Sequence, residues 1–400
     1  MRDRGALLLL SLRLTAVLLA ALLLGLALAA PLARAAAPAP PPGEAEFRAA
    51  WIAFSAPSAD PEKARSLEAR QQARMAAIPK MEEAVSADPK NPLYYESLAY
   101  ICLTAGQYEK GRKAVDQGIA LKRDRPLLYL LRGQAEAARA QMNPRTARDN
   151  IGPALSAFDQ AGRLDPQNSL PLLQAASVAF DVGRPDLALP RVEQALQRPT
   201  CRLYRLALPE NLDPDRGASF RMWQYAQLGA WMELLARCRN AHSSLLRLGE
   251  KAEEENDLPG AEARFQQALA VGRHAGQAEP NLFITVATAL DLLEDAYGAL
   301  GRVAEARGDP QAERWQGEAG VIRVARGQLA GALQGYIKEI SGSPPPSLDQ
   351  LLALEGRHVA PVIRGMGLQP QPSQAGVGEE RPAVTLAPAL PQQQPAPGAP

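Results

Sequence analysis

The feature that most restricts the fold of this 400-residue chain is a pattern that returns after 34 positions. Tyr95 and Ala99 are followed at this distance by Tyr129 and Gly133. A period of this length indicates stacked copies of a unit made of two helices. Ala99 and Gly133 are small, as expected where two helices cross so closely that a larger side chain would not fit.

Three units recur in one register between residues 92 and 198. The first has a turn at Gly106, the second begins at Pro126, and the third has a turn at Gly183. Residues 139–153 form an insertion that delays the partner helix of the second unit. A half unit precedes these three. It has the small residues Ala77 and Ala84 and the bulky residue Met81, and it ends at Asp88-Pro89.

This pattern resembles the tetratricopeptide repeat, in which small residues mark the helix crossings and Asp-Pro ends the second helix. The resemblance covers residues 60–198, returns at 245–272 and weakens at 294–320, where Gly317 and Gly320 replace the expected bulky and small residues. It implies an all-α fold in which antiparallel helix pairs stack as a right-handed superhelix, an α-solenoid. The dominance of Ala and Leu favours helix over strand as well.

The remaining segments are placed around these units. Residues 44–54 carry Phe47, Trp51 and Phe54 at helical spacing, so the helical repeats are expected to span 44–198. A helix from Asp60-Pro61 is expected to end at Ile78, because Pro79 interrupts it. Residues 199–217 contain several prolines, and they either divide the array or form a loop wrapped on it.

A second helical region with degenerate pairs is predicted over residues 218–340. Its first helix contains Trp223, Trp231 and Leu235, and because Trp is costly to expose we expect it to pack the two halves together. Residues 341–368 are predicted to form a short helix ending at Gly356 and an extended segment. Residues 369–400, rich in Pro and Gln, are predicted to be a disordered tail.

The N-terminus has the composition of an export signal. A basic start is followed by an uncharged run from Leu14 to Ala30 and by Ala-x-Ala sites. Residues 1–35 are therefore predicted to be a signal peptide or an uncleaved membrane anchor, and residues 36–43 a Pro/Ala-rich spacer. In both cases we expect the protein to lie outside the cytoplasm. If the segment is cleaved, the protein is expected to be periplasmic or secreted; if it is not, the protein is expected to contact the membrane through this segment alone.

The sequence shows no pattern for catalysis, a cofactor or a metal. The three histidines, His242, His274 and His358, stand in no ligand motif, and phosphate loops and nucleophile elbows are absent. Lys plus Arg number 44 and Asp plus Glu 43, so there is no general electrostatic reason to bind nucleic acid. Of the three cysteines, Cys201 and Cys238 could pair in an oxidising compartment; alternatively all three, Cys102 included, are small buried hydrophobic residues.

The resemblance also implies a binding surface. In the tetratricopeptide family the first helix of each pair lines a concave groove, and its exposed positions fall here on largely apolar residues. We call this set the first-helix face: Leu93, Glu96, Tyr100, Leu103, Leu127, Leu130, Gln134, Ala137, Leu170, Leu173, Ser177 and Phe180. An apolar peptide or helix would fit it, or an adjoining segment of the chain itself would fill it.

These observations favour a non-catalytic scaffold or adaptor of the cell envelope that binds a protein or peptide partner. The alternative is a noncatalytic accessory subunit or chaperone of a secretion or cell-wall-building enzyme complex. An enzyme whose site cannot be recognised in the sequence is a third hypothesis. A deep pocket with converging polar groups would favour the enzyme, and an apolar groove would favour peptide binding.

Overall fold

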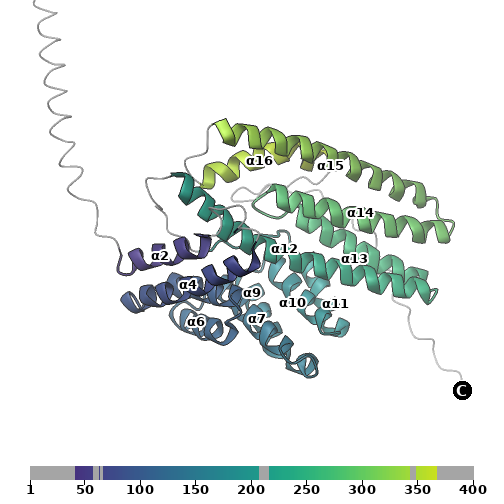
Figure 1. Ribbon diagram of the computed structural model, residues 1–400. Coiled ribbons are helices and arrows are strands. Elements are labelled where there is room, and N and C mark those ends of the chain that lie inside the picture. The colour runs from purple at the N-terminus through teal and green to yellow at the C-terminus, as the bar shows by residue number, and fades with distance from the viewer. Residues whose placement is uncertain (1–40, 57–62, 64–65, 207–215, 343–347, 367–400) are drawn as a thin grey trace, which may run out of the picture. The chain divides into compact units, whose positions relative to one another are not determined.

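The fold is described from a computed structural model, which covers residues 41–56, 63, 66–206, 216–342 and 348–366 (Figure 1). The predicted signal peptide, most of the spacer, the Asp60-Pro61 helix start and the predicted tail lie outside the described residues. Within these ranges the chain forms α-helices and two isolated β-bridges, and no β-strand. The all-α prediction is confirmed.

The first region consists of short antiparallel helix pairs, each helix packed on its neighbour in the sequence. Helix α2 pairs with α4, α5 with α6, α7 with α9, and α10 with α11. The predicted half unit is therefore complete, because α2 supplies its first helix. The short helix α8 lies in the predicted insertion. The helices are α2 (Glu44–Ser55), α4 (Leu67–Ala87), α5 (Pro92–Thr104), α6 (Tyr108–Leu121), α7 (Pro126–Gln141), α8 (Ala147–Asn150), α9 (Gly152–Leu164), α10 (Leu170–Asp181) and α11 (Pro185–Leu196).

The prediction that Pro79 ends a helix is wrong, because α4 continues through it to Ala87. Proline lacks an N–H and leaves the carbonyl of Met75 without its helical donor. Both Pro79 and Met75 are exposed, so that carbonyl lies on the water-facing side of the helix. The buried side of α4 carries Ala77, Met81 and Ala84 and is not interrupted.

The second region has longer helices. They are α12 (Arg216–Glu254), α13 (Leu258–Gly276), α14 (Phe283–Ala306), α15 (Gln311–Gly342) and α16 (Leu348–Gly365). Helix α12 packs on α13, α13 on α14, and α14 on α15, and α16 packs mainly on α15. The prediction of a short helix ending at Gly356 with an extended segment after it is wrong, since α16 runs on through Pro361.

The same turn joins the helices of four pairs, in both regions. The first helix ends at a residue in the left-handed conformation, and the next amide donates to a carbonyl in the last turn at 2.8 or 2.9 Å. Glycine suits this position because it has no Cβ to clash. The left-handed residues are Gly106, Gly183, Asn256 and Gly308.

The small residues expected at the helix crossings lie where the helices meet. A Cβ on Gly133 would come within 2.6 Å of the Phe158 ring on α9, and one on Gly249 within 2.3 Å of the Phe265 ring on α13. At Gly301 on α14 the nearest side-chain atom would be 3.7 Å away, and Gly317 and Gly320 have nothing within 4 Å. The predicted weakening of the repeat at residues 294–320 is therefore visible as a looser crossing.

Candidate partner-binding face

Most of the first-helix face is buried rather than open. Tyr100, Leu127 and Leu130 are at most 6% exposed, and Leu93 is the most exposed member at 36%. Three others are partly buried. The fully or nearly fully buried residues are Glu96, Tyr100, Leu127, Leu130, Ala137, Leu170, Leu173 and Ser177, and the partly buried ones are Leu103, Gln134 and Phe180.

On α5, Tyr100 is enclosed by two other helices of the chain. Its ring lies 6.2 Å from that of Trp51 and 5.9 Å from that of Phe54, both on α2. Helix α12 also lies near this ring, since an added Cβ at Gly229 would stand 3.8 Å from the Tyr100 hydroxyl oxygen, an ordinary van der Waals contact.

Glu96 is held by an ion pair. Its carboxylate accepts hydrogen bonds from both Nε and Nη2 of Arg125, at the start of α7, the second with a length of 3.1 Å. Glu96 is fully buried, and its hydrogen bond with Arg125 raises the pKa of the guanidinium. A buried carboxylate paired in this way connects two successive units and is not available to a ligand.

The part of the face on α10 packs directly against α12. The side-chain amide of Gln174 donates to the carbonyl of Leu234 at 3.0 Å, and Arg237 pairs with Asp181 at 3.0 Å. Burial raises the pKa of Asp181. Residues 229–238 of α12, which we call the cover segment, turn an apolar stripe inward, formed by Ala230, Trp231, Leu234, Leu235 and Cys238.

The first-helix face is therefore covered by the chain itself, at α5 by α2 and the cover segment and at α10 by the cover segment. Of the two alternatives, the structure shows the self-filled arrangement. Binding of a partner to these residues stays a prediction. As expected for a helix between the two regions, α12 packs on α2 and α10 as well as on α13, and Trp231 and Leu235 are both 2% exposed. The side chain of Trp223 lies outside the described part of the structure.

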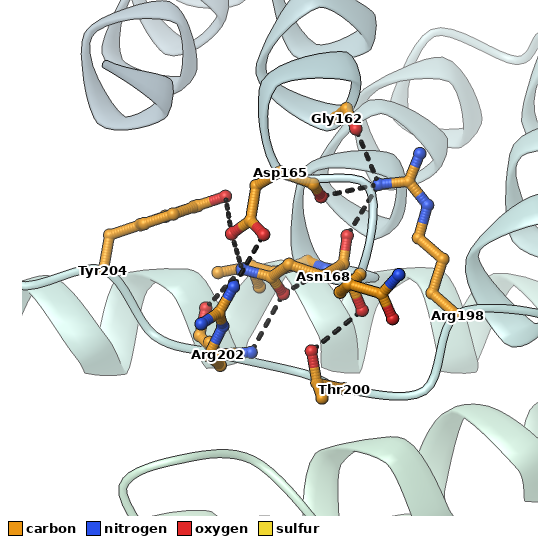
Figure 2. A network of polar contacts seen from close by, with 9 residues as sticks. Gly162, Asp165, Asn168, Arg198, Thr200, Arg202 and Tyr204 are labelled. Atoms are coloured by element: carbon orange, nitrogen blue, oxygen red, sulfur yellow. Dashed lines mark hydrogen bonds and ion pairs between the residues drawn. The ribbon is translucent and has the colours of Figure 1, made fainter. Parts of the chain in front are cut away.

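A second connection between the regions is made by residues 198–206, which we call the strap (Figure 2). The Arg198 guanidinium donates to the carbonyls of Gly162, Asp165 and Asn168 through one nitrogen, at 2.7 to 3.2 Å. Arg202 donates to Asp165 at 2.7 Å and the Tyr204 hydroxyl donates to it at 3.0 Å. The strap is thereby fastened to the turn between α9 and α10.

Backbone pairing fixes the strap on both edges. The amide of Ser169 donates to the carbonyl of Thr200 at 2.8 Å. On the other edge, Glu279, between α13 and α14, donates to the carbonyl of Cys201 and accepts from the amide of Leu203, both at 2.8 Å. The part of the predicted 199–217 linker that the structure describes is thus wrapped on the array.

The structure also shows where possible metal ligands and the histidines lie. Among the residues that the structure describes, no group of three His, Cys, Asp or Glu side chains could hold a metal ion. Over the same ranges no helix is long and apolar enough to cross a membrane. His358 lies 3.0 Å from Glu339 on the surface, whereas His242 is fully buried. Burial lowers the pKa of His242 to about 4.

Together the paired helices, the repeated turn and the consecutive packing define an all-α helical-repeat protein. No family model matches the chain, and neither does any curated protein. Twenty-three chains of known structure match it, among them one in the crystal structure of the APC/C hetero-tetramer Cut9-Hcn1. That match has a TM-score of 0.22 and 16% identity, and it covers 75% of this chain and 55% of the other. A likeness this weak carries no argument about function.

Sequence reasoning missed the cover segment, although its residues were visible. Trp231, Leu234, Leu235 and Cys238 have the spacing of an apolar helical stripe, but that stripe alone does not name the surface it meets. The one local signal was Gly229, a poor helix former within a long helix, which often marks a close approach of another element.

Proposed function

We propose that this protein is an exported, non-catalytic interaction scaffold of the cell envelope. In this proposal the first-helix face receives an amphipathic helix of a partner protein. The observation that carries it is that this face already holds a helix, the cover segment of the same chain. This internal contact supports the choice of an amphipathic helix as the partner.

The contacts of the cover segment describe that ligand. Its buried anchors follow the spacing by which an amphipathic helix is recognised on a helical face, and Trp231 is the largest of them. Its polar contacts with α10 include those of Leu234 with Gln174 and of Arg237 with Asp181. A partner helix with an aromatic anchor and a following Leu pair would therefore compete for the same surface.

A peptide competition experiment tests the proposal. A fluorescent peptide with the sequence of residues 229–243 is titrated into the native protein and into a Trp231→Ala/Leu235→Ala variant, whose own cover segment is weakened. We expect the variant to bind the peptide at least about tenfold more tightly, because less of its face is occupied at equilibrium. Met232→Ala is the matched control, since Met232 is on the same helix but 51% exposed.

Two results would contradict the proposal. One is a variant that remains helical and takes up no peptide, which would mean that partners bind elsewhere. The other concerns export: residues 1–43 fused to a reporter active only outside the cytoplasm should give a signal. An inactive fusion that stays soluble in the cytoplasm would remove the cell envelope from the proposal and leave the scaffold.

A further inference from the structure

Two of the three cysteines are neighbours in the core. Cys201 in the strap is 1% exposed and Cys238 in the cover segment is fully buried, and their thiols hydrogen bond to each other. Cys102 on α5 is also fully buried but has other surroundings, since Lys110 and Glu82 are the charged groups that act on it. The chain therefore has one cysteine pair and one separate cysteine.

The backbone on both sides of the pair is fixed. The carbonyl of Cys201 accepts from Glu279, and the residues next to it, Thr200 and Arg202, pair with the turn before α10. On the side of Cys238, the indole N–H of Trp231 donates to the carbonyl of Tyr204 at 3.0 Å. These contacts hold the strap against the cover segment and keep the two thiols together.

We propose that Cys201 and Cys238 are joined by a disulfide bond when the chain folds in an oxidising compartment. The oxidant is an external disulfide, either glutathione disulfide or a dithiol oxidoreductase in its disulfide form. One cysteine thiolate attacks the external disulfide, forms a mixed disulfide and releases one thiol. The second cysteine attacks the protein sulfur of the mixed disulfide and releases the second thiol, so that two protons pass to the released thiols and the oxidant is reduced.

The two thiols differ in their environment within the folded pair. The hydrogen bond from the Cys238 thiol lowers the pKa of Cys201, whereas donating that bond raises the pKa of Cys238. Because neither sulfur reaches solvent, the bond forms while the chain folds, and once formed it is shielded from external thiols.

Counting free thiols tests this inference without reference to any partner. The full chain is unfolded, refolded in a glutathione redox buffer, denatured in the presence of an alkylating reagent and weighed by mass spectrometry. We expect one alkylated cysteine, Cys102, and a linked peptide pair containing Cys201 and Cys238. The oxidised protein should also melt at least about 4 °C above the reduced protein.

Single substitutions make the result specific. Cys102→Ser should leave the linked pair and no alkylated cysteine, whereas Cys201→Ser and Cys238→Ser should each leave two alkylated cysteines. If refolding fails, the same alkylation is applied to the full chain trapped in acid directly from an oxidising expression compartment. Three alkylated cysteines in the native sequence, or a bond that involves Cys102, would overturn the inference. This outcome would leave the proposed partner face untouched.

Discussion

The helices of the first region and those of the second share their turns but differ in length. In the first region α5, α6, α7, α9, α10 and α11 have 12 to 16 residues and only α4, in the first pair, reaches 21, whereas α12 to α15 have 19 to 39. Yet Gly106, Gly183, Asn256 and Gly308 end their helices in the same conformation. Ala99, Ala176, Gly249 and Gly301 precede these turns at one common spacing. The repeat is thus conserved in the part of each pair nearest the turn.

The additional length lies at the ends away from the turns, and it has other uses. Helix α12 pairs with α13 near Gly249, while its earlier residues form the cover segment. In helix α15, Tyr336 in the second half packs beside Phe283 on α14 and His358 on α16, so this extension stays within the second region. The short pairs thus provide a surface that the extension of α12 covers, whereas the extension of α15 packs on its own region.

The strongest way to break this comparison is to place charge within the buried first-helix face. The double substitution Tyr100→Asp and Leu130→Asp puts two carboxylates at positions that are 6% and 1% exposed. Burial without a partner should cost more than about 4 kcal/mol of unfolding free energy, measured by denaturant titration followed by circular dichroism. Leu93→Asp, on the same face but more exposed, should cost less than about 1 kcal/mol. A double variant of native stability would show that the face is open.

A matched pair of substitutions with smaller expected effects compares the tight crossing of α12 with α13 and the looser crossing of α14 with α15. Gly249→Ala places a methyl group 2.3 Å from the buried Phe265 ring, so we expect a loss of about 2 to 3 kcal/mol in unfolding free energy. Gly301→Ala occupies the corresponding position with ordinary spacing and should gain up to about 1 kcal/mol, because alanine favours the helix. Equal effects in the two variants would mean that α14 and α15 cross as closely as α12 and α13.

Acid should distinguish the regions further, because all three histidines lie in the second one. The pKa of His242 is lowered from 6.5 to about 4, so the folded state favours the neutral ring. Its contribution is complete above pH 6.5 and is lost as the pH falls toward 4. Between pH 7 and pH 5 the unfolding free energy should fall by about 2 kcal/mol because of this histidine. His274 has a pKa shifted in the same direction.

The measurement is the unfolding free energy at several pH values for the native protein and for His242→Leu. The difference between them should change by the amount stated, with exchange of backbone amides rising first in α12 and α14. Parallel pH profiles for the two proteins would contradict the assignment to His242. A loss of protection that begins in α5 to α7 would contradict the regional difference.

The sequence predicted the parts of the fold that local chemistry determines. The turns at Gly106 and Gly183 require a residue in the left-handed conformation, and the helix crossing at Gly133 has no room for a side chain. Glycine satisfies both requirements, so its spacing in the sequence predicted these features. The prediction that a helix ends at Pro79 was wrong, because a helix tolerates a proline on its exposed side and exposure depends on the tertiary structure.

The candidate face was chosen on the first helices, and sequence reasoning left its occupant open between a partner and the chain itself. Positions such as Tyr100 and Leu173 were chosen by register, and register says which way a residue points, not what lies above it. The cover segment meets α10 through contacts such as Gln174 with Leu234, far apart in the sequence. Contacts between residues so far apart in the sequence produce no periodic pattern in it.

The strap changes how the array is expected to lose its structure. In a simple repeat array each unit touches only its neighbours, and unfolding can proceed one unit at a time from either end. Here Asp165 and Asn168 are tied through Arg202 and Cys201 to Glu279, across the boundary between the two regions. Unfolding that starts at either end therefore reaches units that the strap connects by hydrogen bonds before it reaches the middle. We expect the units beside the strap to unfold in one cooperative step.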